Sequence, residues 1–146
     1  MQKGQNLNLT YKAKKTIFSN CKVVKTKNSS ILKYLESSKN LGIKSIYFSE
    51  IKGGYVKGWN LHKKTKCKLS VIFGRIKFTV FNKNKKTLKT YILSRANFSL
   101  LEIPKNNWFK YESLNYPFSI LVNSISIKHS KKEILKKDFN KYRFPE

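Results

Sequence analysis

The strongest constraint on the fold is a series of short segments rich in β-branched and aromatic residues, each followed by a turn signal. The clearest segment runs from Arg75 to Phe81. Its apolar residues Ile76, Phe78 and Val80 alternate with other residues, which places them on one face of a strand. Similar segments recur about every ten residues, at 22–25, 45–51, 57–61, 66–73, 90–93, 98–103 and 118–123. Such a succession predicts an all-β sandwich or barrel.

The two ends of the chain lack this pattern. Residues 1–15 are polar and basic, which predicts a flexible arm or an edge strand. Residues 16–146 contain no repeat and no linker, so we expect a single domain, with one short helix at Lys131–Asn140. No apolar run has the length of a signal peptide core or a membrane span. We therefore expect a cytoplasmic protein in which Cys21 and Cys67 are reduced.

The net charge is the most extreme property of the composition. The chain has 32 Lys and Arg residues against 7 Asp and Glu residues, a net charge of +25. An excess of this size is typical of proteins that bind a polyanion. The basic residues are mostly lysine and are spread along the chain with many Asn, Ile and Ser residues, which is also typical of proteins from AT-rich genomes. Both origins stay open, and either one favours binding of a nucleotide diphosphate.

The segment Lys57–His62, Lys-Gly-Trp-Asn-Leu-His, resembles a signature of the dTDP-4-dehydrorhamnose 3,5-epimerase family. Three further stretches similar to the family follow in the same order, at residues 73–80, 97–104 and 107–111. Smaller relatives of that family also carry Tyr-Phe-Ser-Glu-Ile, here Tyr47–Ile51. The resemblance implies a metal-free cupin, which is a double-stranded β-helix or jelly-roll barrel. It also implies activity on a nucleotide-linked 4-keto-6-deoxysugar.

The resemblance makes His62 the candidate catalytic base. An imidazole can remove a proton from carbon near neutral pH when an adjacent carbonyl stabilises the enolate. Lys68 is the second catalytic candidate, because it can stabilise the enolate oxygen, and Lys66 and Lys57 are candidates for binding the diphosphate. Lys66 and Lys68 share one strand face, and their role requires that face to be the barrel interior. The alternatives are an ordinary hydrogen-bonded histidine and a solvated lysine face.

Three further residues are candidates for binding the substrate. Trp59 and Trp108 can stack on the nucleobase or the sugar, although aromatic residues of a barrel are more often core. Glu50 is one of the few acidic residues and can orient His62, bind sugar hydroxyls, or be an ordinary surface charge.

The chain also departs from the family. Residues 121–123, Leu-Val-Asn, stand where the family has its tyrosine acid, and Asp138 is the one counterpart suggested for the carboxylate that partners the histidine. No metal and no other cofactor is expected, because Lys64 and Phe109 occupy the positions of ligand histidines in metal-binding cupins. His129 is expected in a surface loop.

The sequence thus predicts an isomerase or epimerase that removes the proton alpha to the ketone of a nucleotide-diphosphate sugar, in the synthesis of a surface polysaccharide such as lipopolysaccharide. A homodimer formed through edge strands is expected. A non-catalytic cupin that binds sugar nucleotides is the main alternative. A nucleic-acid-binding β-barrel is less favoured, because it needs a contiguous basic face.

Overall fold

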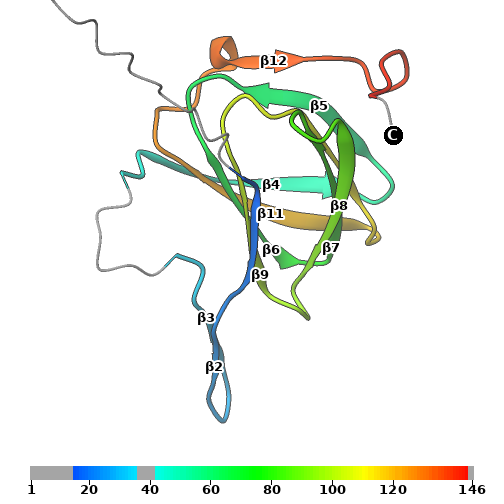
Figure 1. Ribbon diagram of the computed structural model, residues 1–146. Coiled ribbons are helices and arrows are strands. Elements are labelled where there is room, and N and C mark those ends of the chain that lie inside the picture. Colours follow the sequence, from blue (N-terminus) through cyan, green and yellow to red (C-terminus); the bar gives the residue numbers. More distant parts are fainter. Residues whose placement is uncertain (1–14, 36–41, 145–146) are drawn as a thin grey trace, which may run out of the picture.

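The computed structural model describes residues 15–35 and 42–144, which fold mainly into antiparallel strands (Figure 1). The first sheet has the order β1 (Ile17–Asn20), β9 (Ser99–Ile103), β6 (Cys67–Phe73), β11 (Phe118–Ile125) and β4 (Ser45–Lys52). The second sheet has the order β12 (Ile134–Lys136), β5 (Val56–His62), β10 (Phe109–Ser113), β7 (Arg75–Asn82) and β8 (Thr87–Ser94). From β4 to β7 consecutive strands alternate between the sheets. This is the predicted all-β jelly roll. The predicted arm lies outside these residues, except for Lys15.

The two sheets enclose an apolar core between their facing sides. The alternation in β7 is confirmed, because Ile76, Phe78 and Val80 are all buried. They belong to one core cluster with Leu69 and Val71 of β6, which come from the other sheet. Burying an apolar side chain of this size contributes about 1.5–3 kcal/mol, so this layer holds the two sheets together.

The predicted C-terminal helix is wrong. Lys131–Glu133 form a single 3-10 turn (η1), and the chain continues as β12 along the edge of β5 (Figure 1). Ile134 of β12 pairs with His62 in that ladder. The physical reason is long-range pairing: β5 would otherwise leave its backbone groups open on that side, and the β12 backbone satisfies them.

A second apolar cluster anchors the C-terminal segment. Trp59 and Leu61 of β5 pack with Trp108 and Phe144, and all four side chains are buried. Phe144 contacts the Trp59 ring edge-on, with 4.7 Å between ring centroids. The chain that follows β12 therefore returns to the second sheet and covers part of it.

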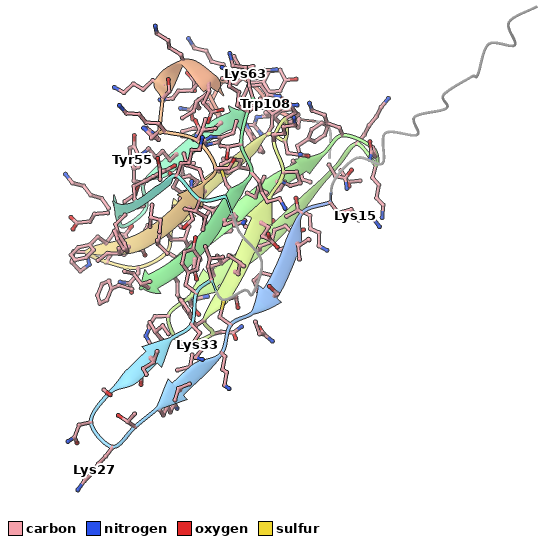
Figure 2. All side chains as sticks on the ribbon, turned by 90° about the vertical axis from the view of Figure 1, so that its left-hand side faces the viewer. Lys15, Lys27, Lys33, Tyr55, Lys63 and Trp108 are labelled. Carbon is pink, nitrogen blue, oxygen red and sulfur yellow. The ribbon has the colours of Figure 1, made fainter. Side chains whose placement is uncertain are left out.

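One hairpin stands away from the two sheets (Figure 1). It consists of β2 (Val23–Lys25) and β3 (Ser30–Leu32), with Lys27 near its tip (Figure 2). In the part of the chain that the structure describes, no helix has the length and apolarity needed to cross a bilayer.

Candidate functional site

His62 lies at one end of the barrel. β5 ends there at His62, and the short loop that follows leads into β6. In the first sheet, the antiparallel register places the end of β11 beside the starts of β4 and β6, with Ser124 opposite both Ile46 and Lys68. The Thr65 hydroxyl, in the loop between β5 and β6, lies 2.9 Å from that of Ser126, just after β11. The two sheets are thus joined at this end.

His62 is held by Glu133 of η1. The His62 Nδ1 lies 2.5 Å from Glu133 Oε1, and the two residues are only 6% and 4% exposed. The other carboxylate oxygen accepts hydrogen bonds from the backbone N–H groups of Lys63 and Lys64, at 2.9 and 3.2 Å. A carboxylate on Nδ1 holds the Nδ1–H tautomer and leaves Nε2 as the basic nitrogen. The imidazole ring also lies nearly parallel to that of Phe109, with centroids 6.1 Å apart.

The carboxylate partner was therefore assigned wrongly from the sequence. Asp138 is exposed, and its side chain accepts a hydrogen bond from the Asn140 N–H at 2.9 Å within its own turn. Glu133 was overlooked inside a lysine run. The available signal was the Ser130-x-x-Glu133 spacing, which is a common start of a helical turn. Indeed the Ser130 side chain accepts a hydrogen bond from the backbone of that turn.

Tyr47 of β4 contributes a phenol at the same end. Its hydroxyl oxygen accepts a hydrogen bond from Asn123 Nδ2 of β11 at 2.7 Å. Burial raises the pKa of Tyr47 to about 12, and the negative charge of Glu133 adds to this effect. The phenol is therefore protonated at neutral pH. Tyr47 is half-buried, and its ring packs edge-on against that of His129, with 4.9 Å between centroids. His129 itself is exposed, as predicted.

Two further side chains extend this polar group into the core. Cys67 is 1% exposed, and burial raises the pKa of its thiol to about 12. Burial also raises the pKa of Tyr111, and ionisation of the nearby Tyr47 and Cys67 at alkaline pH adds to the effect. Both groups keep their protons at neutral pH, so Cys67 is not a nucleophilic thiolate.

The structure does not bring the predicted lysines to His62. Cys67 and Leu69 of β6 point into the core, so Lys66 and Lys68 face away from the barrel interior. Lys66 Nζ lies 3.7 Å from Glu102 Oε1, and Lys66 is only half-buried. The condition for their role, a shared interior face, is therefore not met. Lys57 is exposed near the start of β5, at the opposite end of that strand from His62.

The other three predicted residues also lie elsewhere. Glu50 is exposed on β4, one of a set of exposed residues that alternate with the less exposed Tyr47 and Ile51, and Glu133 rather than Glu50 holds His62. Trp59 and Trp108 belong to the buried cluster around Phe144, as core residues. Figure 2 shows Lys63, the residue after His62, close to the β12 segment.

Two cavities in the described part of the molecule are not lined by His62. The larger, about 580 Å³, is lined by β7, β8 and β10 residues such as Lys77, Thr79 and Lys110, together with Phe139. A smaller one of about 210 Å³ includes Lys66 and Lys68. Within residues 15–35 and 42–144, no three His, Cys, Asp or Glu side chains are grouped as metal ligands.

Two facing sheets with a histidine held at one end define a cupin-type jelly roll, and comparison with known proteins gives the same class. No protein-family model and no curated protein matches the sequence. Solved structures do match. The dTDP sugar isomerase from Desulfovibrio desulfuricans G20 has a TM-score of 0.78 and 22% identity, covering 86% of this chain and 85% of that chain.

Two enzymes with more specific names are similar in the same way. A variant of the 3,4-ketoisomerase from Thermoanaerobacterium thermosaccharolyticum, in complex with TDP-4-keto-6-deoxyglucose, has a TM-score of 0.70 and 17% identity, covering 84% of this chain and 87% of that chain. The dTDP-4-dehydrorhamnose 3,5-epimerase from Sulfolobus tokodaii has a TM-score of 0.74 and 19% identity, covering 89% of this chain and 81% of that chain. The chain thus has the fold of these enzymes, as the sequence motifs indicated.

Proposed function

We propose that this protein is an isomerase or epimerase of a nucleotide-linked 4-keto-6-deoxysugar. The observation that carries the proposal is the buried His62–Glu133 pair in the barrel. The pair lies in a fold shared with a dTDP sugar isomerase, a 3,4-ketoisomerase and a 3,5-epimerase. The ketoisomerase structure contains a substrate of this class, TDP-4-keto-6-deoxyglucose.

The chemistry follows from the arrangement of the pair. Glu133 accepts a hydrogen bond from the Nδ1–H of His62, so the unprotonated Nε2 can take a proton from the carbon next to the ketone. The electron pair of the broken C–H bond forms the C=C bond of an enolate, and the carbonyl electrons move to the ketone oxygen. The imidazolium that results is stabilised by the Glu133 carboxylate at 2.5 Å.

Binding of the diphosphate is supported by charge. The net charge of +25 attracts an anionic substrate to the whole molecule. Lys63 and Lys64 are exposed and directly follow His62, and their backbone is fixed by Glu133. They replace Lys57, Lys66 and Lys68 as the cations that we assign to the diphosphate.

We extend the proposal to assembly and location. β1 and β4 are the open edges of the first sheet, and β4 exposes Ile46 and Phe48, which favours pairing with a second copy into a homodimer. Cys21 and Cys67 form no disulfide, which is consistent with a cytoplasmic enzyme. Sugars of this class would supply the synthesis of a surface polysaccharide such as lipopolysaccharide.

The test is exchange of solvent deuterium into dTDP-4-keto-6-deoxyglucose, followed by NMR. The wild-type protein should introduce deuterium at the carbon next to the ketone. His62→Asn should lower that rate at least about a hundredfold, because general base catalysis contributes about 10²–10⁴-fold. Thermal unfolding of the variant must match the wild type, so that the loss reports on chemistry. Binding of the sugar nucleotide without exchange by the wild-type protein would contradict the proposal and indicate a non-catalytic binding protein.

A further inference from the structure

β12 continues into a segment, residues 137–144, that we call the C-terminal latch (Figure 1). Its first residue, Lys137, exchanges two backbone hydrogen bonds with Trp59 of β5. The Trp59 N–H donates to the Lys137 carbonyl at 2.9 Å, and the Lys137 N–H donates to the Trp59 carbonyl at 3.0 Å. The ladder that begins with Ile134 opposite His62 thus extends to Trp59. The latch therefore starts on the same strand that carries the histidine.

The latch is held by two kinds of contact with aromatic rings. The Lys137 ammonium lies 3.7 Å from the ring centroid of Tyr142 and 4.9 Å from that of Trp108. Such a cation is attracted to the face of an aromatic ring. At the far end of the latch, the Phe144 ring is 6% exposed and stacks on that of Phe81 of β7, with 4.3 Å between centroids. The latch is thus fixed to the second sheet at both of its ends.

β12 by itself buries little apolar surface. It has only three residues, of which Leu135 is 45% exposed and Lys136 is also exposed. An edge strand this short, with exposed side chains, gains little from apolar burial. Burial comes instead from Phe144 of the latch, whose ring belongs to the second core cluster. Since Glu133 directly precedes β12, its position depends on how firmly that strand is held.

We propose that Phe144 and Lys137 are positioning residues for His62. They hold β12 on β5 and thereby keep the Glu133 carboxylate 2.5 Å from Nδ1 of the imidazole. This inference rests on the function proposed above, because that function makes His62 the base. It adds that the base depends on a cluster of rings to which the histidine itself does not belong.

The chemical consequence of the latch is the choice of tautomer. A carboxylate that accepts a hydrogen bond from Nδ1–H keeps the proton on that nitrogen and leaves Nε2 unprotonated. When the latch opens, β12 loses its hold on β5 and the Glu133 carboxylate leaves the ring. The neutral imidazole of His62 then carries its proton on either nitrogen. Molecules that carry it on Nε2 cannot use that nitrogen as the base, so exchange slows.

The experiment measures the tautomer directly and without substrate, by NMR of protein labelled with ¹⁵N in histidine. The chain has two histidines, and the exposed His129 serves as the internal reference. In the wild-type protein, the neutral ring of His62 should be in the Nδ1–H form. Phe144→Ala should shift it to a mixture of both tautomers and leave His129 unchanged. Deuterium exchange into dTDP-4-keto-6-deoxyglucose should fall about ten- to a hundredfold, as is typical when the group that orients a functional histidine is lost.

Two control variants separate positioning from general loss of stability. Phe98 is 4% exposed and lies just before β9 of the first sheet, so Phe98→Ala removes an equally buried ring outside the latch. It should lower stability in urea but keep the Nδ1–H tautomer, with exchange within about threefold of wild type, because distant sites act independently. Phe144→Leu keeps an apolar anchor on the second sheet and should restore the Nδ1–H tautomer.

A further variant keeps the test valid if Phe144→Ala does not fold. Lys137→Met keeps the backbone pairing with Trp59 and removes only the charge, and should shift the tautomer in the same direction while slowing exchange about threefold. Folded Phe144→Ala with an unchanged tautomer would overturn the inference, as would an equal shift in Phe98→Ala. If Phe144→Ala is unfolded, an unchanged tautomer in Lys137→Met would overturn it. Absence of exchange in the wild-type protein would instead overturn the proposed function, whereas the tautomer would still decide the role of the latch.

Discussion

Glu133 has a structural and a chemical task at the same time. One carboxylate oxygen contacts His62, and the other accepts two backbone hydrogen bonds from the start of the loop between β5 and β6. A buried carboxylate is costly unless its oxygens are satisfied, and here three donors satisfy them. The orientation of His62 and the shape of the loop therefore depend on one side chain.

Glu133→Gln should weaken both functions. The amide oxygen can serve His62 or the backbone N–H groups of Lys63 and Lys64, but the NH₂ group then faces donors on the other side. We expect deuterium exchange to slow about ten- to a hundredfold, as is typical when the group that orients a functional histidine is removed. The free energy of unfolding in urea should fall by about 1–3 kcal/mol. Glu50→Gln makes the same change at an exposed site, and an equal effect there would contradict this role of Glu133.

At the level of elements, β5 depends on its close approach to β10. Gly58 has φ +116°, and a Cβ atom there would lie 2.8 Å from the Phe109 carbonyl oxygen and 2.9 Å from Lys110 Cα. These are backbone atoms, which cannot move without shifting β10. The glycine of the Lys-Gly-Trp motif thus allows β5 to lie close to β10 and to place His62 near Phe109.

Gly58→Ala should therefore destabilise the barrel by more than about 2 kcal/mol, from backbone strain plus the steric overlap. Gly42→Ala is the matched control, because Gly42 also has a positive φ of +61° but a Cβ atom there would meet nothing within 4 Å. It should cost only about 1 kcal/mol. Urea unfolding of both variants measures the difference. Equal losses would mean that the approach of β10 is not what requires a glycine.

The elements also show what the sequence could predict. The buried face of β7 could be predicted because the polarity of each residue indicates the face on which it lies. Ile76, Phe78 and Val80 are buried as expected. The alternation along β6 did not show which of its two faces is interior. In the structure Cys67 is buried in the core, whereas Lys68 faces away from it. Neither β12 nor the contact of Glu133 with His62 could be predicted from local sequence, because both depend on long-range pairing with β5. Glu133 is 71 residues from His62.

For the whole molecule, the surface lysines and the buried cysteine and tyrosine side chains change the stability of the fold in opposite directions at alkaline pH. Two lysine–carboxylate pairs of the described residues, Lys66–Glu102 and Lys77–Glu112, are partly exposed. Loss of protons from the lysines relieves repulsion between them as pH rises. Inside, Cys67, Tyr47 and Tyr34 have their pKa raised to about 12 by burial.

The interior groups should make the fold less stable above about pH 9. The folded pKa of Cys67 is raised from 9.0 to about 12, so between these values the unfolded chain releases a proton that the native protein keeps. The stabilisation from a neutral buried thiol is therefore complete below pH 9 and is lost as the pH rises toward 12, at about 1.4 kcal/mol per pH unit. Cys67→Ala isolates this contribution, because the lysines and tyrosines are common to both proteins. The stability advantage of wild type over Cys67→Ala in urea should be constant from pH 7 to 8.5 and should shrink from pH 9 to 11. An advantage that stays constant to pH 11 would mean that Cys67 ionises as readily in the folded barrel as in the unfolded chain.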